Sequence, residues 1–203
     1  MKISSKTEIC NLALARIEQS SISSFEEGED DSMQAKYSRM CYEQAKSALL
    51  SCYNWTFAVD SASLNTVEYN DAIKEYTYKY SLPDRFLGFI ALYNGINEEV
   101  LGSNYKPLFC LMGGCLYTDI NNAKIKYIKD IDEISKFSPL FIDCLVLQLA
   151  IRLTRLFQSS GTYLQQLEQE LEFMLREAKA NDCRQVSLGG LRAFPLLAAT
   201  GEF

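Results

Sequence analysis

The sequence predicts an α+β fold: an antiparallel four-helix bundle, a small antiparallel β-sheet lobe inserted between helices 2 and 3, and an extended C-terminal tail. Three observations predict it. Apolar residues recur at helical spacing near both ends of the chain, β-rich segments fill the middle, and an apolar end with glycines and a proline has no helical period. We therefore expect the bundle at 1–54 plus 135–186, the β-rich lobe at 55–134 and the tail at 187–203.

Two helices are expected before residue 55. Ser5 is followed three residues later by Glu8, which is the capping-box pattern, so the first helix should span residues 5–19. Apolar residues from Tyr37 to Cys52 mark the buried face of a second helix. The acidic loop between them, 20–31, is interpreted as solvated, because its contiguous carboxylates lack the spacing of a calcium loop.

The middle of the chain predicts short strands rather than helices. Residues rich in β-branched and aromatic side chains occur at 55–59, 76–82, 86–92, 108–112 and 124–128. Gly113-Gly114 is interpreted as a hairpin turn, since no helix begins after it as phosphate binding would require. So few short strands bury little by themselves, and we expect a small sheet that leans on the helices.

The third helix has the best-defined start. Ser138 can cap it, and Pro139 stands at the first helical position, where its missing N–H costs nothing. Residues 140–157 are almost entirely apolar, which is typical of a helix at the centre of a bundle. Its few polar side chains form one stripe, expected to pair with Asp143 or Glu170 or to face a neighbouring subunit: Gln148, Arg152 and Arg155.

A fourth helix should begin near Thr162, where Gln165 completes a second capping box. Beyond Asp182 the helical period stops, and an apolar tail follows from Ser187 to Phe203. We expect the tail to dock on a neighbouring molecule, because its large side chains would be a liability if left exposed. The alternative is a disordered or self-docked end. The interface candidates are Leu191, Phe194, Leu196, Leu197 and Phe203.

Several kinds of chemistry are excluded or disfavoured. The chain has no histidine, which removes the Ser-His-Asp and Cys-His triads and the HExxH metal sites. Its seven cysteines include no Cys-x-x-Cys pair, so we interpret them as core filler. The carboxylate pairs Glu168 with Glu172 and Asp130 with Asp132 are interpreted as solvated. No catalytic residue, cofactor site or metal site is expected.

Charge and hydropathy limit the partners. The net charge of −6 argues against a protein that holds nucleic acid through its overall field. The longest apolar run is too short for a membrane span, so no membrane is expected. The single tryptophan follows the second helix and should lie at the joint between the two lobes. The residues expected to form the core of that joint are Trp55, Phe57, Phe137 and Phe141.

Five segments carry a family resemblance: 8–17, 54–58 with Asn54-Trp55-Thr56-Phe57-Ala58, 80–83 with Tyr80-Ser81-Leu82-Pro83, 116–153, and 177–180 with Glu177-Ala178-Lys179-Ala180. In this order they resemble the tail tubular protein A family, the head-to-tail adaptors of short-tailed bacteriophages and related prophages. The similarity spans roughly residues 5 to 183. Each segment alone is a weak structural signature. A glycine is common in the family where this chain has Glu18, so the exit of the first helix should differ.

The resemblance implies a structural virion protein and not an enzyme. Family members form a twelve-fold ring that joins the portal protein to the tail nozzle protein and extends the channel for double-stranded DNA, without sequence-specific binding. Such a protein is made in the bacterial host cytoplasm and ends in the neck of the virion. Two alternatives stay open: a head-completion connector of another phage type, and a histidine-free ligand-binding or enzymatic domain.

Overall fold

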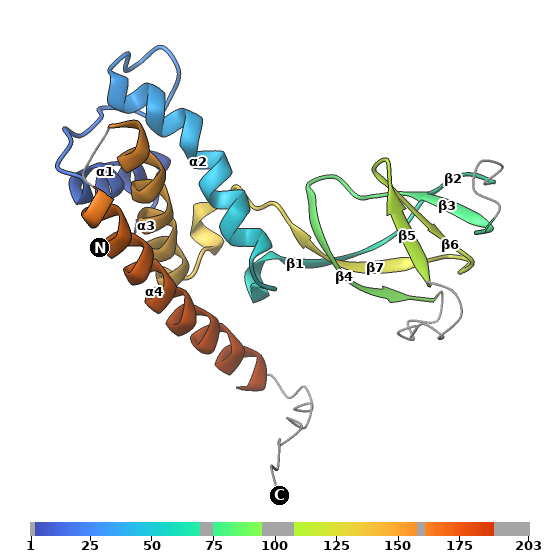
Figure 1. Ribbon diagram of the computed structural model, residues 1–203. Helices are drawn as coiled ribbons and strands as arrows, with labels where there is room; N and C mark the ends of the chain where they lie inside the picture. Colours follow the sequence, from blue (N-terminus) through green and yellow to red (C-terminus); the bar gives the residue numbers. More distant parts are fainter. Residues whose placement is uncertain (1–2, 70–74, 95–107, 158–160, 189–203) are drawn as a thin grey trace, which may run out of the picture.

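The helices and the sheets of the computed structural model occupy opposite ends of an elongated molecule (Figure 1). The structure describes residues 3–69, 75–94, 108–157 and 161–188. The four helices are α1 (Lys6–Arg16), α2 (Met33–Ser51), α3 (Pro139–Leu156) and α4 (Gly161–Leu188). The strands are β1 (Val59–Ser63), β2 (Thr66–Tyr69), β3 (Tyr78–Ser81), β4 (Phe86–Tyr93), β5 (Phe109–Met112), β6 (Cys115–Thr118) and β7 (Lys124–Lys129).

The described helices do not form the predicted four-helix bundle, so that part of the prediction is wrong. Instead α1, α2 and α4 each pack on α3, while α1 and α2 touch each other very little. The reason lies in α3, which buries side chains around most of its circumference from Phe141 to Thr154. A helix that is apolar on nearly all sides takes neighbours on several faces. The other three helices therefore pack around α3, and the four do not form the square arrangement of a four-helix bundle.

The helix starts follow the predicted capping chemistry. The Ser5 hydroxyl accepts the backbone N–H of Glu8 at 3.1 Å, and the Glu8 carboxylate accepts the backbone N–H of Ser5 at 3.1 Å. The Ser138 hydroxyl accepts from the backbone N–H of Phe141 at 3.3 Å, and Pro139 is the first residue of the helix. After α1, Glu18 has a φ of 56°, the left-handed conformation that glycine adopts most easily.

The prediction of a small sheet lobe is also wrong, because the seven strands form two antiparallel sheets. The first has the order β1-β7-β4 and the second β2-β3-β6-β5. They share a core of their own, which contains Leu64, Tyr80, Leu92, Leu116, Ala123, Ile125 and Tyr127. Strands β2 and β6, both of the second sheet, are absent from the prediction, and β1 shares only Val59 with a predicted segment. Without β2 and β6 the remaining segments predict too small a lobe.

Two local predictions have different outcomes. Residues 55–59 do not form a strand: Thr56–Ala58 is a 3₁₀ turn, in which the Ala58 N–H donates to the Trp55 carbonyl at 2.9 Å, and β1 begins at Val59. The hairpin turn at Gly113-Gly114 is confirmed. It joins β5 to β6 with φ values of 57° and 73°, which glycine adopts without steric cost.

Strand β7 belongs to both hydrophobic cores. Ile125 and Tyr127 face the second sheet, whereas Ile128 points the other way and joins the core that the helices form. Gly88 of β4 makes room there, since a Cβ at its position would lie 3.2 Å from Cδ1 of Ile128. The first sheet is therefore the layer through which the helices contact the β-rich part. None of the helices in the described ranges is long and apolar enough to cross a membrane.

Candidate functional site at the joint between helices and sheets

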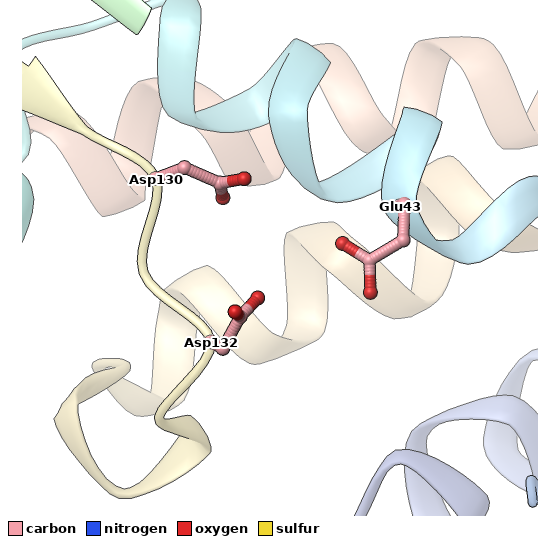
Figure 2. Close-up of side chains that lie close together, drawn as sticks. All are labelled: Glu43, Asp130 and Asp132. Atoms are coloured by element: carbon pink, nitrogen blue, oxygen red, sulfur yellow. The ribbon is translucent and has the colours of Figure 1, made fainter. Parts of the chain in front are cut away.

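A buried lysine occupies the polar centre of the joint. The side chain of Lys46, on α2, is only 1% exposed, and its ammonium lies 2.7 Å from a Glu43 carboxylate oxygen and 3.0 Å from one of Asp130. It also donates a short hydrogen bond to Asp132. Figure 2 shows the three carboxylates converging from α2 and from the segment after β7. We call these four residues the Lys46 cluster.

The cluster continues to two further cations. The Lys6 ammonium of α1 lies 2.8 Å from Glu43, and the Arg85 guanidinium lies 2.8 Å from Asp132. Arg85 precedes β4, and its backbone carbonyl accepts the N–H of Asp130 at 2.8 Å. A continuous set of polar contacts therefore joins α1 and α2 to the segments next to β4 and β7.

The pKa shifts agree with an ion-paired cluster. Burial alone would lower the pKa of Lys46, but hydrogen bonds to Asp132, Glu43 and Asp130 outweigh it and raise the pKa above its ordinary value. The hydrogen bond from Lys46 lowers the pKa of Asp132. Burial works to raise the pKa of Glu43, yet the bonds from Lys46 and Lys6 lower it. Lys46, Glu43 and Asp132 are therefore charged near neutral pH.

The three carboxylates have the spacing of a possible cation site. One oxygen from each of Glu43, Asp130 and Asp132 lies within 4.8 Å of the others. Oxygen ligands of this kind suit a hard divalent cation. However, the ammonium of Lys46 already lies among them and supplies the positive charge. A metal ion would have to displace a buried lysine, so the arrangement fits a structural ion cluster better than a metal centre.

The four aromatic residues predicted for the joint lie together, and we call them the aromatic cluster. The ring centroids of Trp55 and Phe141 are 5.2 Å apart, those of Phe57 and Phe141 are 5.0 Å apart, and those of Phe137 and Phe141 are 4.9 Å apart. Trp55 is fully buried, and its indole N–H donates to the Leu49 carbonyl at 2.8 Å. The cluster therefore links the end of α2, the start of α3 and the turn before β1.

The C-terminal half of α4 is fastened to the same place. Asp182 is only 4% exposed, and its carboxylate accepts the backbone N–H of Thr56 at 3.0 Å as well as the Thr56 hydroxyl proton. Nearby, the Tyr53 hydroxyl lies 2.8 Å from the Cys183 sulfur, and the Lys179 ammonium lies 5.7 Å from the Tyr53 ring centroid. Helix α4 thus contacts the turn through which the chain enters the first sheet.

The other predicted positions have different outcomes. The interface candidates Leu191, Phe194, Leu196, Leu197 and Phe203 lie outside the described residues. The polar stripe of α3 pairs within the chain, but with other partners than expected: Arg155 with Glu168 at 3.0 Å, and Arg152 with the Gln44 side chain at 3.1 Å.

The cysteines vary in exposure. Cys10, Cys41 and Cys144 are buried, whereas Cys52 and Cys183 are exposed. Burial raises the pKa of the Cys10 and Cys144 thiols to about 12, so both stay protonated near neutral pH and pack as small apolar groups.

Sequence reasoning missed the Lys46 cluster. It interpreted Asp130 and Asp132 as solvated, whereas the structure brings both to a buried ammonium. The available signal was the position of Lys46, which shares a helix face with Tyr42 and Leu49, both buried. A lysine on the apolar face of a helix requires a carboxylate partner, because burying an unpaired charge is costly.

Comparisons with known proteins do not assign this site. No protein-family model matches the chain, and no curated protein sequence matches it.

Proposed function

We propose that this protein is a structural component of a bacteriophage particle: a head-to-tail adaptor whose copies form a ring between the portal protein and the tail nozzle protein. The observation that carries the proposal is the elongated subunit, with helices at one end and two sheets at the other, held by a packed joint (Figure 1). A closed ring needs two different faces on each subunit, one for each neighbour. Two dissimilar ends provide such faces.

Exposed apolar side chains support an assembly. Large hydrophobic residues lie exposed on the helices, where Phe173 of α4 is 57% exposed, and on the second sheet as well. Scattered exposed apolar residues are normal, but several on both ends give contacts that a neighbour could cover. Those on the helices include Met33, Met40 and Phe173, and those on the sheet include Val67, Leu111 and Met112.

The polar clusters favour a structural role over an enzymatic one. The carboxylates that could perform acid–base chemistry are ion-paired: Asp130 and Asp132 with Lys46, Glu168 with Arg155, and Glu172 with Arg176. A general base needs access to a substrate proton, and these groups already have cationic partners. The net charge of −6 suits a channel through which DNA moves without strong binding.

The test is assembly with the portal. The purified chain should bind a portal ring from the same phage, giving a complex of ring size by light scattering and an added ring below the portal in negative-stain images. A matched sample without portal shows whether the subunit assembles alone. A chain that stays monomeric and leaves the portal ring unchanged contradicts the proposal.

The tail gives a second, narrower test. We propose that the segment after α4 contributes to this assembly through Leu191, Phe194, Leu196, Leu197 and Phe203. A chain that ends at Leu188 should keep the helical circular dichroism of the full chain and bind the portal ring more weakly. Equal binding by both chains rejects the role of the tail without affecting the adaptor proposal.

A further inference from the structure

A largely apolar pocket of 400 Å³ lies beside the start of α3, and none of the roles described above uses it. Its size is within the range of about 300–1,000 Å³ that is usual for binding pockets. The segment before α1, the 3₁₀ turn Ile134–Lys136 and the first turns of α3 form its wall. We call it the Ile142 pocket, and it is lined by Ile3, Ile134, Ser135, Phe137, Pro139, Ile142 and Asp143.

The wall of the Ile142 pocket is fixed by packing. Phe137 and Ile142 are 6% and 7% exposed, because both also belong to the core that the helices form. The ring centroid of Phe137 lies 4.9 Å from that of Phe141, and the cap by Ser138 fixes the start of α3. A pocket whose wall is already ordered binds an apolar side chain without the entropic cost of ordering that wall.

The pocket also carries a negative charge that has no counter-ion in the described part of the chain. The carboxylate of Asp143 belongs to the lining and is exposed. Arg152 and Arg155, two of the side chains expected to pair with it, contact Gln44 and Glu168 instead. Among the residues that the structure describes, no cation lies at ion-pairing distance from Asp143. The pocket therefore suits an apolar segment that carries one positive charge.

The C-terminal tail has that composition. From Ser187 to Phe203 its one basic residue is Arg192, which directly follows Leu191 and stands two residues before Phe194. Large apolar side chains grouped in this way are a liability if they stay exposed. An aromatic side chain that fills a pocket, with an arginine beside it, is typical of the few residues that dominate the binding energy of an interface.

We infer that the tail of one copy binds the Ile142 pocket of a neighbouring copy, with Leu191 and Phe194 in its apolar part and Arg192 at Asp143. The inference rests on the proposed function and deepens it, because it names the surface to which the tail binds. Each copy would give its tail to one neighbour and receive the tail of the other. Such an exchange is heterologous, as a closed ring of more than two copies requires.

The end of α4 directs the tail away from its own helices. After the buried Asp182, the side chains of Cys183 and Arg184 are exposed. Figure 1 shows the last turns of α4 projecting past the other helices. The fifteen residues 189–203 can span up to about 50 Å when extended, which is enough to reach an adjacent subunit. A neighbouring copy is therefore the partner that the direction of α4 favours.

Site-specific cross-linking of the full chain tests the inference. The photoreactive residue benzoylphenylalanine replaces Phe194, and an equal mixture of isotope-labelled and unlabelled chains is irradiated, both alone at high concentration and together with the portal ring. Mass spectrometry then identifies the cross-linked peptides. We expect cross-links from the tail to residues 134–143, and we expect them to join labelled to unlabelled chains.

A charge exchange tests the predicted ion pair. Asp143→Arg should lower the yield of this cross-link by roughly fivefold, the upper end for an exposed ion pair, and Arg192→Asp should lower it by a similar factor. The double variant should recover the yield, which a general disturbance of the fold would not do. A mixture of the two single variants should recover it in part, because the pocket of one variant then matches the tail of the other.

Glu27→Arg is the matched control. Glu27 is exposed and lies in the acidic loop before α2, outside the Ile142 pocket, so its replacement changes the net charge by the same amount. The cross-link yield of this variant should equal that of the chain without a charge change. Circular dichroism of each variant excludes misfolding as the cause of a lower yield.

Several results would overturn the inference. They are cross-links that form only within one chain, cross-links only to the portal, no cross-link to residues 134–143 in either sample, and a double variant that recovers nothing. Portal binding is measured separately by light scattering. Portal binding without the cross-link between chains contradicts the inference alone, whereas the cross-link without portal binding contradicts the adaptor proposal alone.

Discussion

The aromatic cluster and the Lys46 cluster lie at the same joint but stabilise it by different physics. Burial of aromatic rings is strongly favourable and tolerates small changes of angle. Ion pairs at a buried site gain little net free energy, because desolvation offsets the attraction, but they require a defined geometry. The comparison suggests a division of roles: the rings hold the two parts together, and the Lys46 cluster sets their orientation.

Removing the largest ring should have the largest effect. Trp55→Ala leaves a cavity beside Phe141 and removes the bond to Leu49, so we expect a loss of about 3–5 kcal/mol in the free energy of unfolding. Chemical denaturation followed by circular dichroism measures it. Trp55→Phe is the control, and it should lose less. A loss of stability no larger than that caused by Lys46→Met would contradict the division of roles.

Removing the buried ammonium should cost less. Lys46→Met keeps the length of the side chain and its apolar stem, but leaves three neighbouring carboxylates without their shared partner, so we expect a loss of about 1–3 kcal/mol. Small-angle scattering should also show a wider distribution of shapes, because the orientation is no longer fixed. An unchanged scattering profile, with stability reduced, would show that the cluster does not set the orientation.

Acid should lower the stability of the folded chain by protonating a carboxylate of the Lys46 cluster. The pKa of Asp132 is lowered in the folded chain, chiefly by the hydrogen bond from Lys46. A lowered pKa means that the contribution to stability is complete above the unfolded value of about 3.9 and is lost as pH falls through the folded value. Stability of the unaltered chain should therefore fall more steeply below that pH than stability of Lys46→Met. Parallel curves would contradict this assignment.

The exposed end of the ion network should matter least. Arg85 is more than half exposed, and its pair with Asp132 is open to solvent. Exposed ion pairs contribute about 0.2–1 kcal/mol, so Arg85→Gln should change stability only slightly, and less at high salt. Thermal unfolding at low and high ionic strength measures the effect. A loss equal to that of Lys46→Met would show that the contribution of an ion pair to stability does not depend on its burial.

The predictable parts of this fold are those whose signals are local. The caps at Ser5 and Ser138 and the turn at Gly113-Gly114 depend on residues close together in the sequence, so their types alone indicate the structure. The bundle and the sheet size depend on distant pairings. No short sequence pattern indicates that β6 (Cys115–Thr118) pairs with both β3 and β5. None indicates that α1 and α2 pack on α3 and hardly on each other.

The same distinction applies to the candidate site. The grouping of Trp55, Phe57, Phe137 and Phe141 at one place follows their position at the changes between helical and β-rich segments. The Lys46 cluster joins residues more than eighty positions apart, since the hydrogen bond from Lys46 to Asp132 spans 86 positions. Only the position of Lys46 on the apolar face of its helix could have indicated the cluster. That position does not identify the partners of Lys46.

The pairing of β1 with β7 has a consequence for how such a subunit can change over generations. The chain leaves the helices at Val59 and returns after Ile128, and these two residues face each other across neighbouring strands. Everything between them is an insert whose two ends meet at one narrow neck. Insertions and deletions between Val59 and Ile128 can therefore lengthen or reshape the β-rich end while the helices keep their sequence. The size of the β-rich end can then evolve separately from the helical end.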